Sequence, residues 1–388
     1  MDEIQRAEEL RDELVRDRRY FHETAEVGLD VPLARAYILK RLGELGVEAQ
    51  VCGAGVRAEL GHGGPVLLLR ADFDALPMPE ESGLPFQSRT PGHCHACGHD
   101  LHAAMLLGAA RLLKAREAAL PGTVRLMFQP GEECFLGARS MIDAGILAEP
   151  RPEAALACHV AAGRAAPGAV FCQKSGTMML SVDEFSVLLR GRGAHGAYPE
   201  HAVDPITMGV ALHQALQGLR GRESGAYAAG VLTVGQFTAG SAPNILPDTA
   251  LLRGTLRTGD EKTRLRLKRR LRETAAGVAA VYGGTAEVEF TSSAPALLCD
   301  PALTGELTGY AAELGLTVRD GVRSGASEDF AAVAAEVPAT FLYLTAGFPD
   351  ARGDVPAHNP KVQFNEDVLP LGAALLSYCA RRWLEKRA

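Results

Sequence analysis

The sequence predicts an α/β protein with a mixed, largely parallel sheet, into which a smaller domain is inserted. Two observations support this fold class. Short apolar runs at residues 66–69, 124–128 and 154–158 each lead into polar or glycine-rich residues, and a helical segment at 101–116 separates the first two. A different pattern of alternating strands and long helices begins near residue 181. Apolar strands that alternate with helices favour a parallel sheet, because strands buried on both faces are apolar throughout.

The strands and helices of the first pattern come from two stretches of the chain, one before residue 181 and one after residue 295. Helix-compatible segments at 2–18 and 32–45 come first, and Gly46 supplies a stop for the second helix. After residue 295 the first pattern returns, with a helix expected at 301–314, a strand at 339–345 and a last helix at 367–385. The strands of the larger domain therefore come from two separate parts of the chain.

The segment between these parts reads βαββαβ, the order of a ferredoxin-like unit. Its expected elements are strands at 182–189, 230–237, 250–256 and 285–290, and helices at 204–219 and 260–282. We therefore expect a domain of residues 181–292 inserted into a discontinuous domain of residues 1–180 and 293–388.

Composition excludes several classes of protein. The 388 residues are 47% hydrophobic and 22% charged, which is typical of a globular chain of about two domains. The net charge is −7 and no long basic block occurs, so nucleic acid is not expected as a partner. The amino terminus is densely charged, and no stretch approaches the roughly 18 apolar residues of a membrane span. We expect a soluble, cytoplasmic protein without membrane contacts.

Residues 92–102, GHCHACGHDLH, hold six potential metal ligands in eleven residues. Such a cluster would be a poor choice for a hydrophobic core, so it favours a metal site. Cys94 and Cys97 also form a CxxC pair, which leaves a redox pair or half of a zinc ribbon as alternatives. A ribbon needs a second CxxC, and the sequence has none.

Two adjacent carboxylates, Glu132 and Glu133, follow the apolar run at 124–128. Neighbouring side chains in an extended chain point to opposite sides, so one carboxylate can hold a metal while the other faces the substrate. That division suits metal-assisted hydrolysis, in which the second carboxylate takes a proton from water. His159 and His358 are further candidate ligands, and an aspartate at a strand end, such as Asp72 or Asp74, commonly orients a ligand histidine.

Five ordered motifs resemble those of the dinuclear metallo-amidohydrolases, a family in the aminoacylase and carboxypeptidase clan that includes hippurate hydrolases, indole-acetyl-amino-acid hydrolases and N-acetyl-diaminopimelate deacetylases. The motifs are LRADFDALP at 69–77, HACGHD at 95–100, QPGEE at 129–133, HV at 159–160 and HNPK at 358–361. The resemblance covers nearly the whole chain. It implies a two-metal, aminopeptidase-like catalytic domain and an inserted ferredoxin-like lid that dimerises.

The resemblance also assigns roles to residues. It implies Cys97, His99, Glu133, His159 and His358 as the metal ligands, with Cys97 bridging two ions. Glu132 would be the general base. His195 would reach a neighbouring subunit's site and polarise the scissile carbonyl. The remaining matches would orient a ligand or contact the substrate: Asp74, Asn244, Arg257 and Glu328.

The activity that follows is hydrolysis of the amide bond of N-acyl amino acids, with acetyl, benzoyl or other acyl groups. The resemblance implies two divalent ions per subunit as the cofactor. Mixed His, Glu and Cys ligation suits zinc, and manganese, cobalt and nickel also fit. We expect a homodimer or higher homo-oligomer formed through the lid domain. A dipeptidase or carboxypeptidase of the same clan is the alternative enzyme. A metal-binding or redox CxxC protein without hydrolase activity is the alternative from another class.

Three cysteines depart from the family pattern: Cys94, Cys134 and Cys158. They stand next to predicted ligands or within the ligand motif. We expect them to place extra thiols close to the metals, with an effect on metal preference or on sensitivity to oxidation.

Overall fold

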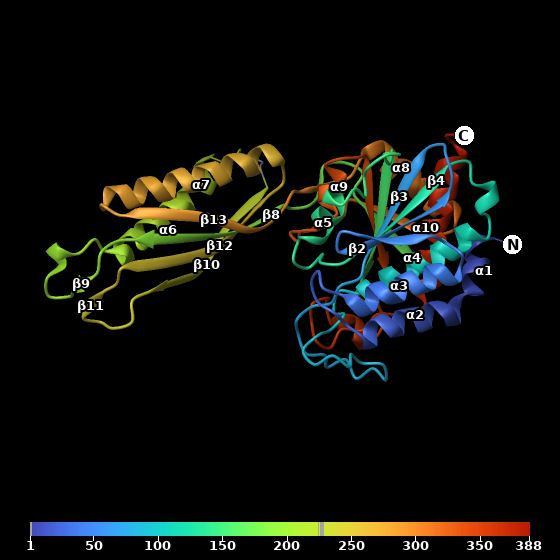
Figure 1. The fold of residues 1–388 in the computed structure, drawn as a ribbon, viewed down its shortest axis with the longest axis horizontal. Coiled ribbons are helices and arrows are strands. Elements are labelled where there is room, and N and C mark those ends of the chain that lie inside the picture. The colour runs from blue at the N-terminus through green and yellow to red at the C-terminus, as the bar shows by residue number, and fades with distance from the viewer. Residues whose placement is uncertain (1, 224, 226–228) are drawn as a thin grey trace. The chain divides into compact units, whose positions relative to one another are not determined.

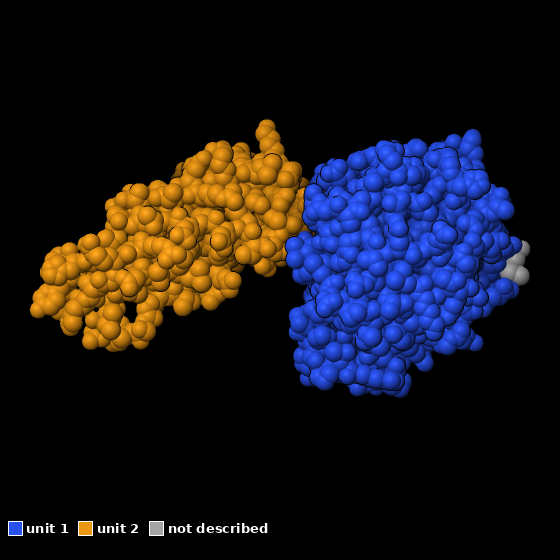
Figure 2. All heavy atoms as spheres, in the orientation of Figure 1, with its two compact units in different colours: residues 1–178, 298–323, 329–388 blue, residues 179–297, 324–328 orange. Residues whose placement is uncertain are grey.

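The computed structural model (Figure 1) describes residues 2–223, 225 and 229–388. They form two compact units, which Figure 2 shows in blue and orange. Unit 1 comprises Met1–Met178, Leu298–Arg323 and Asp329–Ala388, and unit 2 comprises Met179–Leu297 and Ser324–Glu328. The chain thus leaves unit 1 and returns to it twice.

Unit 1 is built on an eight-stranded sheet of order β1-β2-β4-β3-β5-β16-β6-β15. Its strands are β1 (Ala49–Cys52), β2 (Gly55–Gly61), β3 (Val66–Asp72), β4 (Thr123–Gln129), β5 (Ala154–Ala161), β6 (Ala169–Cys172), β15 (Thr317–Asp320) and β16 (Ala339–Thr345). Strands β4, β3, β5 and β16 are parallel neighbours, whereas β2 and β6 pair antiparallel with β4 and β16. Every residue of β3 and β4 is buried. The predicted mixed, largely parallel α/β fold is confirmed.

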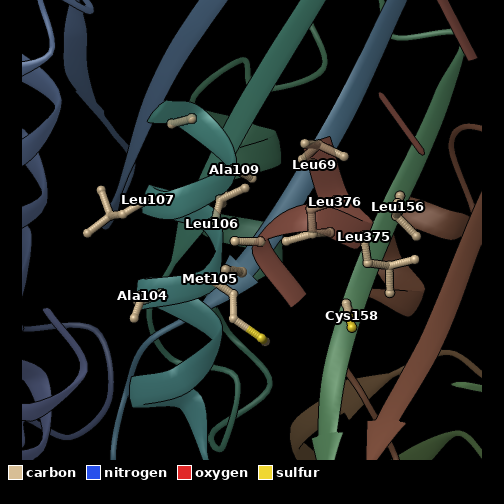
Figure 3. Packing of buried hydrophobic residues seen from close by; sticks show 14 of the residues in the cluster. Leu69, Ala104, Met105, Leu106, Leu107, Ala109, Leu156, Cys158, Leu375 and Leu376 are labelled. Carbon is tan, nitrogen blue, oxygen red and sulfur yellow. The ribbon is translucent and has the colours of Figure 1, made fainter. Parts of the chain in front are cut away.

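The helices of unit 1 are α1 (Glu3–Glu8), α2 (Arg11–Glu23), α3 (Pro32–Glu44), α4 (His99–Lys114), α5 (Gly137–Asp143), α8 (Pro301–Glu313), α9 (Ala331–Ala334) and α10 (Val368–Glu385). Nearly all of α4 is buried, and it shares the main hydrophobic core with α10. Figure 3 shows Met105 and Leu106 of α4 in this core, together with Leu375 and Leu376 of α10. None of the helices within the described residues has both the length and the apolar character needed to cross a membrane.

Some elements of unit 1 differ from the expectation. The single helix expected at 2–18 is two helices, α1 and α2, with a turn at Glu9 and Leu10 between them. Strands β1, β2, β6 and β15 were not predicted. Three of them, β1, β6 and β15, have only four residues each, and at least one face of each strand is partly exposed. They therefore lack the continuous apolar run that marks β3 and β4.

Unit 2 contains a four-stranded antiparallel sheet of order β10-β12-β8-β13. Its main elements are β8 (Val182–Arg190), α6 (Pro205–Glu223), β10 (Gly230–Ala239), β12 (Thr249–Thr258), α7 (Glu261–Val281) and β13 (Thr285–Ala294). This is the βαββαβ order expected from the sequence. Apolar residues of both helices and of the sheet form a separate core. Buried Asp183 accepts from Arg264 at 2.7 Å and ties α7 to β8.

One short segment lies in a different unit from the one expected. Residues 324–328 were assigned to the larger domain, but they belong to unit 2. The reason is a set of hydrogen bonds to this segment: Leu180 N donates to Ala326 O at 3.1 Å, and Arg257 Nη1 donates to Ser327 Oγ at 2.9 Å. Nothing in the local sequence marks so short a return.

The core of unit 1 generates a stability prediction. Leu106 is fully buried on α4, so Leu106→Ala removes apolar contacts and leaves a cavity. We expect the free energy of unfolding of unit 1 to fall by about 2–5 kcal/mol. Urea unfolding followed by the fluorescence of Trp383, the single tryptophan and a buried residue of α10, measures it. The control is Leu33→Ala at an exposed position of α3, which should change stability by less than about 0.5 kcal/mol. Equal losses in the two variants would contradict this picture of the core.

Candidate metal centre

The carboxyl ends of three parallel strands place the candidate site. Strand β3 ends at Asp72, β4 ends at Gln129, and β5 carries His159 near its end. Because β4, β3 and β5 are parallel neighbours, the residues that follow them meet at one edge of the sheet. The loop before α4 approaches the same edge. A Cβ on Gly98, which has a φ of 91°, would lie 2.5 Å from Val160 Cγ2, so only glycine fits this approach.

All five predicted ligands come together in unit 1. Two groups of three have their ligand atoms within 4.8 Å of one another: Cys97, His99 and His159 form one, and Cys97, Glu133 and His358 form the other. Cys97 Sγ lies 3.4 Å from His159 Nε2, and Glu133 Oε1 lies 3.4 Å from His358 Nε2. Cys97 is common to both groups, which is the arrangement that a bridging thiolate needs.

The hydrogen bonds of the histidines leave the right atoms for a cation. His99 Nδ1 donates to Asp74 O at 2.9 Å, and His159 Nδ1 donates to Val160 O at 2.6 Å. Each ring, once neutral, therefore has the lone pair on Nε2 for a metal. Burial opposes the charged form of His99, but Asp72 and Cys97 raise its pKa well above the usual value, so a metal would displace a proton there too. Among the described residues, His99 Nε2 and Glu133 Oε1 are buried without a hydrogen-bond partner, although they lie 4.0 Å apart. Buried polar atoms are rarely left in this state, so the donor set fits divalent cations.

Burial also sets the protonation of the metal-free site. It raises the pKa of Glu133 to about 7 and the pKa of the Cys97 thiol to about 12, and it lowers the pKa of His159 well below its usual value. Cys97 is therefore a neutral thiol without a cation. A bound metal would have to displace the protons of Cys97 and Glu133, so metal binding and proton release are coupled here.

Asp74 holds the two glutamates in place. Its Oδ1 accepts from Glu132 N at 3.1 Å, and its Oδ2 accepts from Glu133 N at 3.2 Å. Glu132 Oε2 lies 4.0 Å from His99 Nε2, the same distance as Glu133 Oε1. Both carboxylates thus reach the edge of the site from a backbone that one buried side chain fixes.

Comparison with known proteins identifies the family of this chain. The model of peptidase family M20/M25/M40 matches residues 68–382. The chain belongs to peptidase family M20/M25/M40. Members of this family hydrolyse amide bonds, and the chain is a hydrolase of this kind rather than a redox protein.

Two curated relatives illustrate the M20/M25/M40 relationship. The chain is 35% identical over 384 residues to N-acetyl-L-cysteine deacetylase of Bacillus subtilis. This match covers 97% of this chain and 89% of the relative. It is 31% identical over 387 residues to thermostable carboxypeptidase 1 of Saccharolobus solfataricus, and this match covers 97% of each chain. The two relatives are named for different amide substrates.

A solved structure of the M20 family extends the comparison to the fold. The YXEP protein of Bacillus subtilis, described as a dinuclear metal binding peptidase, matches with a TM-score of 0.82 and 30% identity. The match covers 97% of this chain and 99% of the other. The likeness therefore spans both units and the whole of the candidate metal centre.

Arg70 was missed as a functional candidate beside the M20/M25/M40 site, whereas its partner Asp72 was expected to orient a ligand histidine. Buried Asp72 pairs with Arg70 Nη1 at 2.7 Å and hydrogen-bonds His102 Nδ1, and its Oδ2 lies 3.7 Å from His99 Nε2. His102 Nε2 accepts from Val160 N at 2.8 Å, so both its ring nitrogens are used and it is not free to bind a metal. The signal in the sequence was Arg70 itself, a charged residue at the end of an otherwise apolar run.

The other predicted site residues lie in unit 2. His195 is in the short strand β9 (Ala194–His195), is exposed, and pairs with Ile245 of β11 (Ile245–Leu246). Gly196 N donates to Asn244 O at 2.8 Å, which brings Asn244 beside the His195 turn. Arg257 bonds Gly325 and Ser327, and Glu328 is buried. The roles of His195, Asn244, Arg257 and Glu328 therefore stay predictions.

Burial disfavours the thiolate form of the three extra cysteines. All eight cysteines are free thiols. Cys94 and Cys158 belong to the main hydrophobic core of unit 1, and burial raises the pKa of each thiol to about 12. Cys158 precedes His159 on β5, so its side chain points to the opposite face, where Figure 3 shows it near Leu375. Of the three extra cysteines, Cys134 is half-buried, and burial raises its pKa as well. High thiol pKa values oppose oxidation.

The protonation of the site predicts how metal binding depends on pH. Because the pKa of Glu133 is about 7 without metal, lowering the pH from 8 to 6 adds a proton that the metal must displace, and affinity should fall. Calorimetric titration of the metal-free chain with Mn²⁺ at both pH values measures this. Glu133→Gln should weaken binding at pH 8 by about tenfold or more.

The matched control for this titration is Glu200→Gln, at an exposed position of unit 2. It should bind Mn²⁺ as the wild type does. Equal affinity in wild type and Glu133→Gln, or an affinity that rises as the pH falls, would show that Glu133 is not a ligand.

Proposed function

We propose that this chain hydrolyses the amide bond of N-acyl amino acids and uses two divalent metal ions to do so. The observation that carries the proposal is the pair Glu132 and Glu133, two adjacent carboxylates fixed by Asp74 at the edge of a five-residue donor set. A metal-binding site alone needs only one of them. The deacetylase relative, named for an N-acyl amino acid, supports the substrate class.

Five residues would hold the ions: Cys97, His99, Glu133, His159 and His358. Mixed His, Glu and Cys ligation suits zinc, and manganese, cobalt and nickel also fit these ligands. When bound, two such cations polarise the scissile carbonyl and make water a better nucleophile at neutral pH.

Glu132 would act as the general base. Its carboxylate takes a proton from the attacking water and then delivers it to the nitrogen of the leaving amino acid, which departs as an amine. Asp74 supports this role because it holds the Glu132 backbone N–H at 3.1 Å and so fixes where the side chain begins. Asp72 and Arg70 would keep His102 oriented, since Asp72 pairs with Arg70 and hydrogen-bonds His102 Nδ1. Asp72 also places a carboxylate oxygen 3.7 Å from His99 Nε2.

The base assignment gives a direct test. Glu132→Gln keeps the shape of the side chain but cannot accept the proton, so kcat should fall by at least about 100-fold. Metal content, measured by elemental analysis, should stay at the wild-type level because Glu132 is not among the proposed ligands. Glu336→Gln, an exposed carboxylate of unit 1, is the control and should keep full activity. A Glu132→Gln rate within about tenfold of wild type would remove the base assignment.

Carboxypeptidase or dipeptidase activity is the second candidate, favoured by the carboxypeptidase relative at 31% identity. A panel of acetyl, benzoyl and indole-acetyl amino acids beside plain dipeptides separates the two. Hydrolysis of the N-acyl amino acids alone supports the deacylase. A preference for dipeptides with a free amino terminus would support the alternative.

We further propose that unit 2 is a lid that dimerises and that His195 polarises the scissile carbonyl in a neighbouring subunit. His195 is exposed, and its Nδ1 accepts from Ala197 N at 3.0 Å, so Nε2 carries the proton that a carbonyl oxygen needs. Asn244 would contact the same substrate, because its backbone bonds the His195 turn. Arg257 would hold the 324–328 segment, and Glu328 would support the site from the end of that segment.

Mixing two inactive variants tests whether His195 acts between subunits. Glu132→Gln keeps His195, and His195→Asn keeps Glu132, so a mixed dimer contains one complete site only if His195 acts across the interface. We expect activity to return when the two purified variants are dissociated and reassembled together. If His195 serves its own subunit, or if the chain is a monomer, mixing restores nothing.

A further inference from the structure

The carboxylate of Asp329 binds donors from three elements of unit 1. Its Oδ1 accepts from Arg70 Nη2 at 3.0 Å and from Gln129 Nε2 at 2.7 Å, and its Oδ2 accepts from Ala138 N at 2.8 Å. Asp329 is 2% exposed, and Arg70 and Gln129 are equally buried. Arg70 belongs to β3, Gln129 to β4 and Ala138 to the first turn of α5. One buried anion therefore joins three elements that are separate in the sequence.

Two of these donors flank the segment that carries the glutamates. We define residues 130–136 as the glutamate loop, which begins after Gln129 and ends where α5 starts. Gln129 and Ala138 thus fasten both ends of the loop to the same carboxylate. The closure is tight: a Cβ on Gly137 would lie 1.7 Å from Pro130 O and 2.8 Å from Gln129 Nε2. Asp74 holds the middle of the loop, and Asp329 holds its ends.

The third donor leads to the ligand histidine. Arg70 bridges Asp329 and Asp72 with its two terminal nitrogens, at 3.0 and 2.7 Å, and its Nε donates to Gln129 Oε1 at 3.0 Å. Asp72 Oδ2 in turn lies 3.7 Å from His99 Nε2. Because these charges are buried, removal of one partner leaves the others uncompensated and forces them to rearrange.

We propose that Asp329 is a positioning residue for the hydrolysis, which orients Glu132 and Glu133 through the glutamate loop and, through Arg70, holds Asp72 beside His99. This inference rests on the proposed function. It assigns a task to Asp329, which stands in the motif SEDF at 327–330, where the sequence indicated a role only for Glu328. Asp329 is also the residue at which the chain re-enters unit 1 from the 324–328 segment.

Asp329→Asn in the full-length chain is the first test. The amide keeps the volume but has one acceptor oxygen, so its NH₂ group must face Gln129 Nε2 or Ala138 N, which are both donors. We expect kcat for an N-acyl amino acid to fall by about 10–100-fold, with KM changed by less than about threefold. In the Glu132→Gln background the same substitution should lower the residual rate much less, because Asp329 acts through that side chain.

Hydrogen exchange gives a readout that does not depend on activity. Amides of residues 130–136 should exchange faster in Asp329→Asn than in the wild type, both without metal, and Mn²⁺ should bind more weakly. The control is Asp183→Asn, an equally buried carboxylate that binds Arg264 and Lys268 in unit 2, and it should leave exchange in the glutamate loop unchanged.

A second variant serves if Asp329→Asn does not fold. Gln129→Met removes the donor to Asp329 but no charge, and it should also speed exchange in residues 130–136. Wild-type exchange in the glutamate loop of the folded variants, or a kcat loss equal to that of Asp183→Asn, would overturn the proposal. If the wild type hydrolyses no N-acyl amino acid, the proposed function fails, while loop exchange and Mn²⁺ affinity still decide the role of Asp329.

Discussion

Buried negative charge at the carboxyl edge of β3 and β4 is the constraint that organises this site. Asp72, Asp74, Glu132 and Glu133 meet there, and an unpaired carboxylate out of water is costly. Asp72 is neutralised by Arg70, and Asp74 accepts two backbone N–H groups. Glu133 has neither solution: one of its oxygens is buried without a hydrogen-bond partner among the described residues, and burial raises its pKa to about 7. A divalent cation would complement this arrangement.

The sequence predicted the elements whose pattern is set by burial. Strands β3, β4, β5 and β16 lie in the middle of the sheet and are almost wholly buried, which explains their apolar runs. The βαββαβ order of unit 2 follows from clear alternation. Strands β1, β6 and β15 were missed because four-residue strands with an exposed side depend on their neighbours rather than on their own composition. The return of residues 324–328 to unit 2 was missed for a similar reason, since backbone hydrogen bonds such as Leu180 N to Ala326 O leave no mark in the side chains.

In the candidate site, too, some residues could be predicted from the sequence and others could not. The gathering of ligand-type side chains was predictable because a metal needs particular atoms, and Cys97, His99 and Glu133 stand in dense motifs. Asp74 was expected from its motif, but Arg70 and Asp329 were not, because their role depends on pairing across the fold. Arg70 and Asp329 are 259 positions apart, and neither residue alone shows that the two will pair. Resemblance gave His195 a role, and the structure places it in β9 of unit 2. The role itself depends on a second subunit, so it stays a prediction.

The conformation of the glutamate loop explains why several buried polar side chains surround Glu132 and Glu133. Phe135 has a φ of 58°, a left-handed conformation that costs a bulky residue about 1–3 kcal/mol. Hydrogen bonds from Phe135 N to Glu132 O and from Leu136 N to Gly131 O hold this turn. Adjacent carboxylates can serve separately, one on a metal and one on a proton, only while their backbone keeps this shape. A strained loop relaxes unless it is fastened, so the anchors at its middle and at its ends are a condition for the proposed division of work between Glu132 and Glu133.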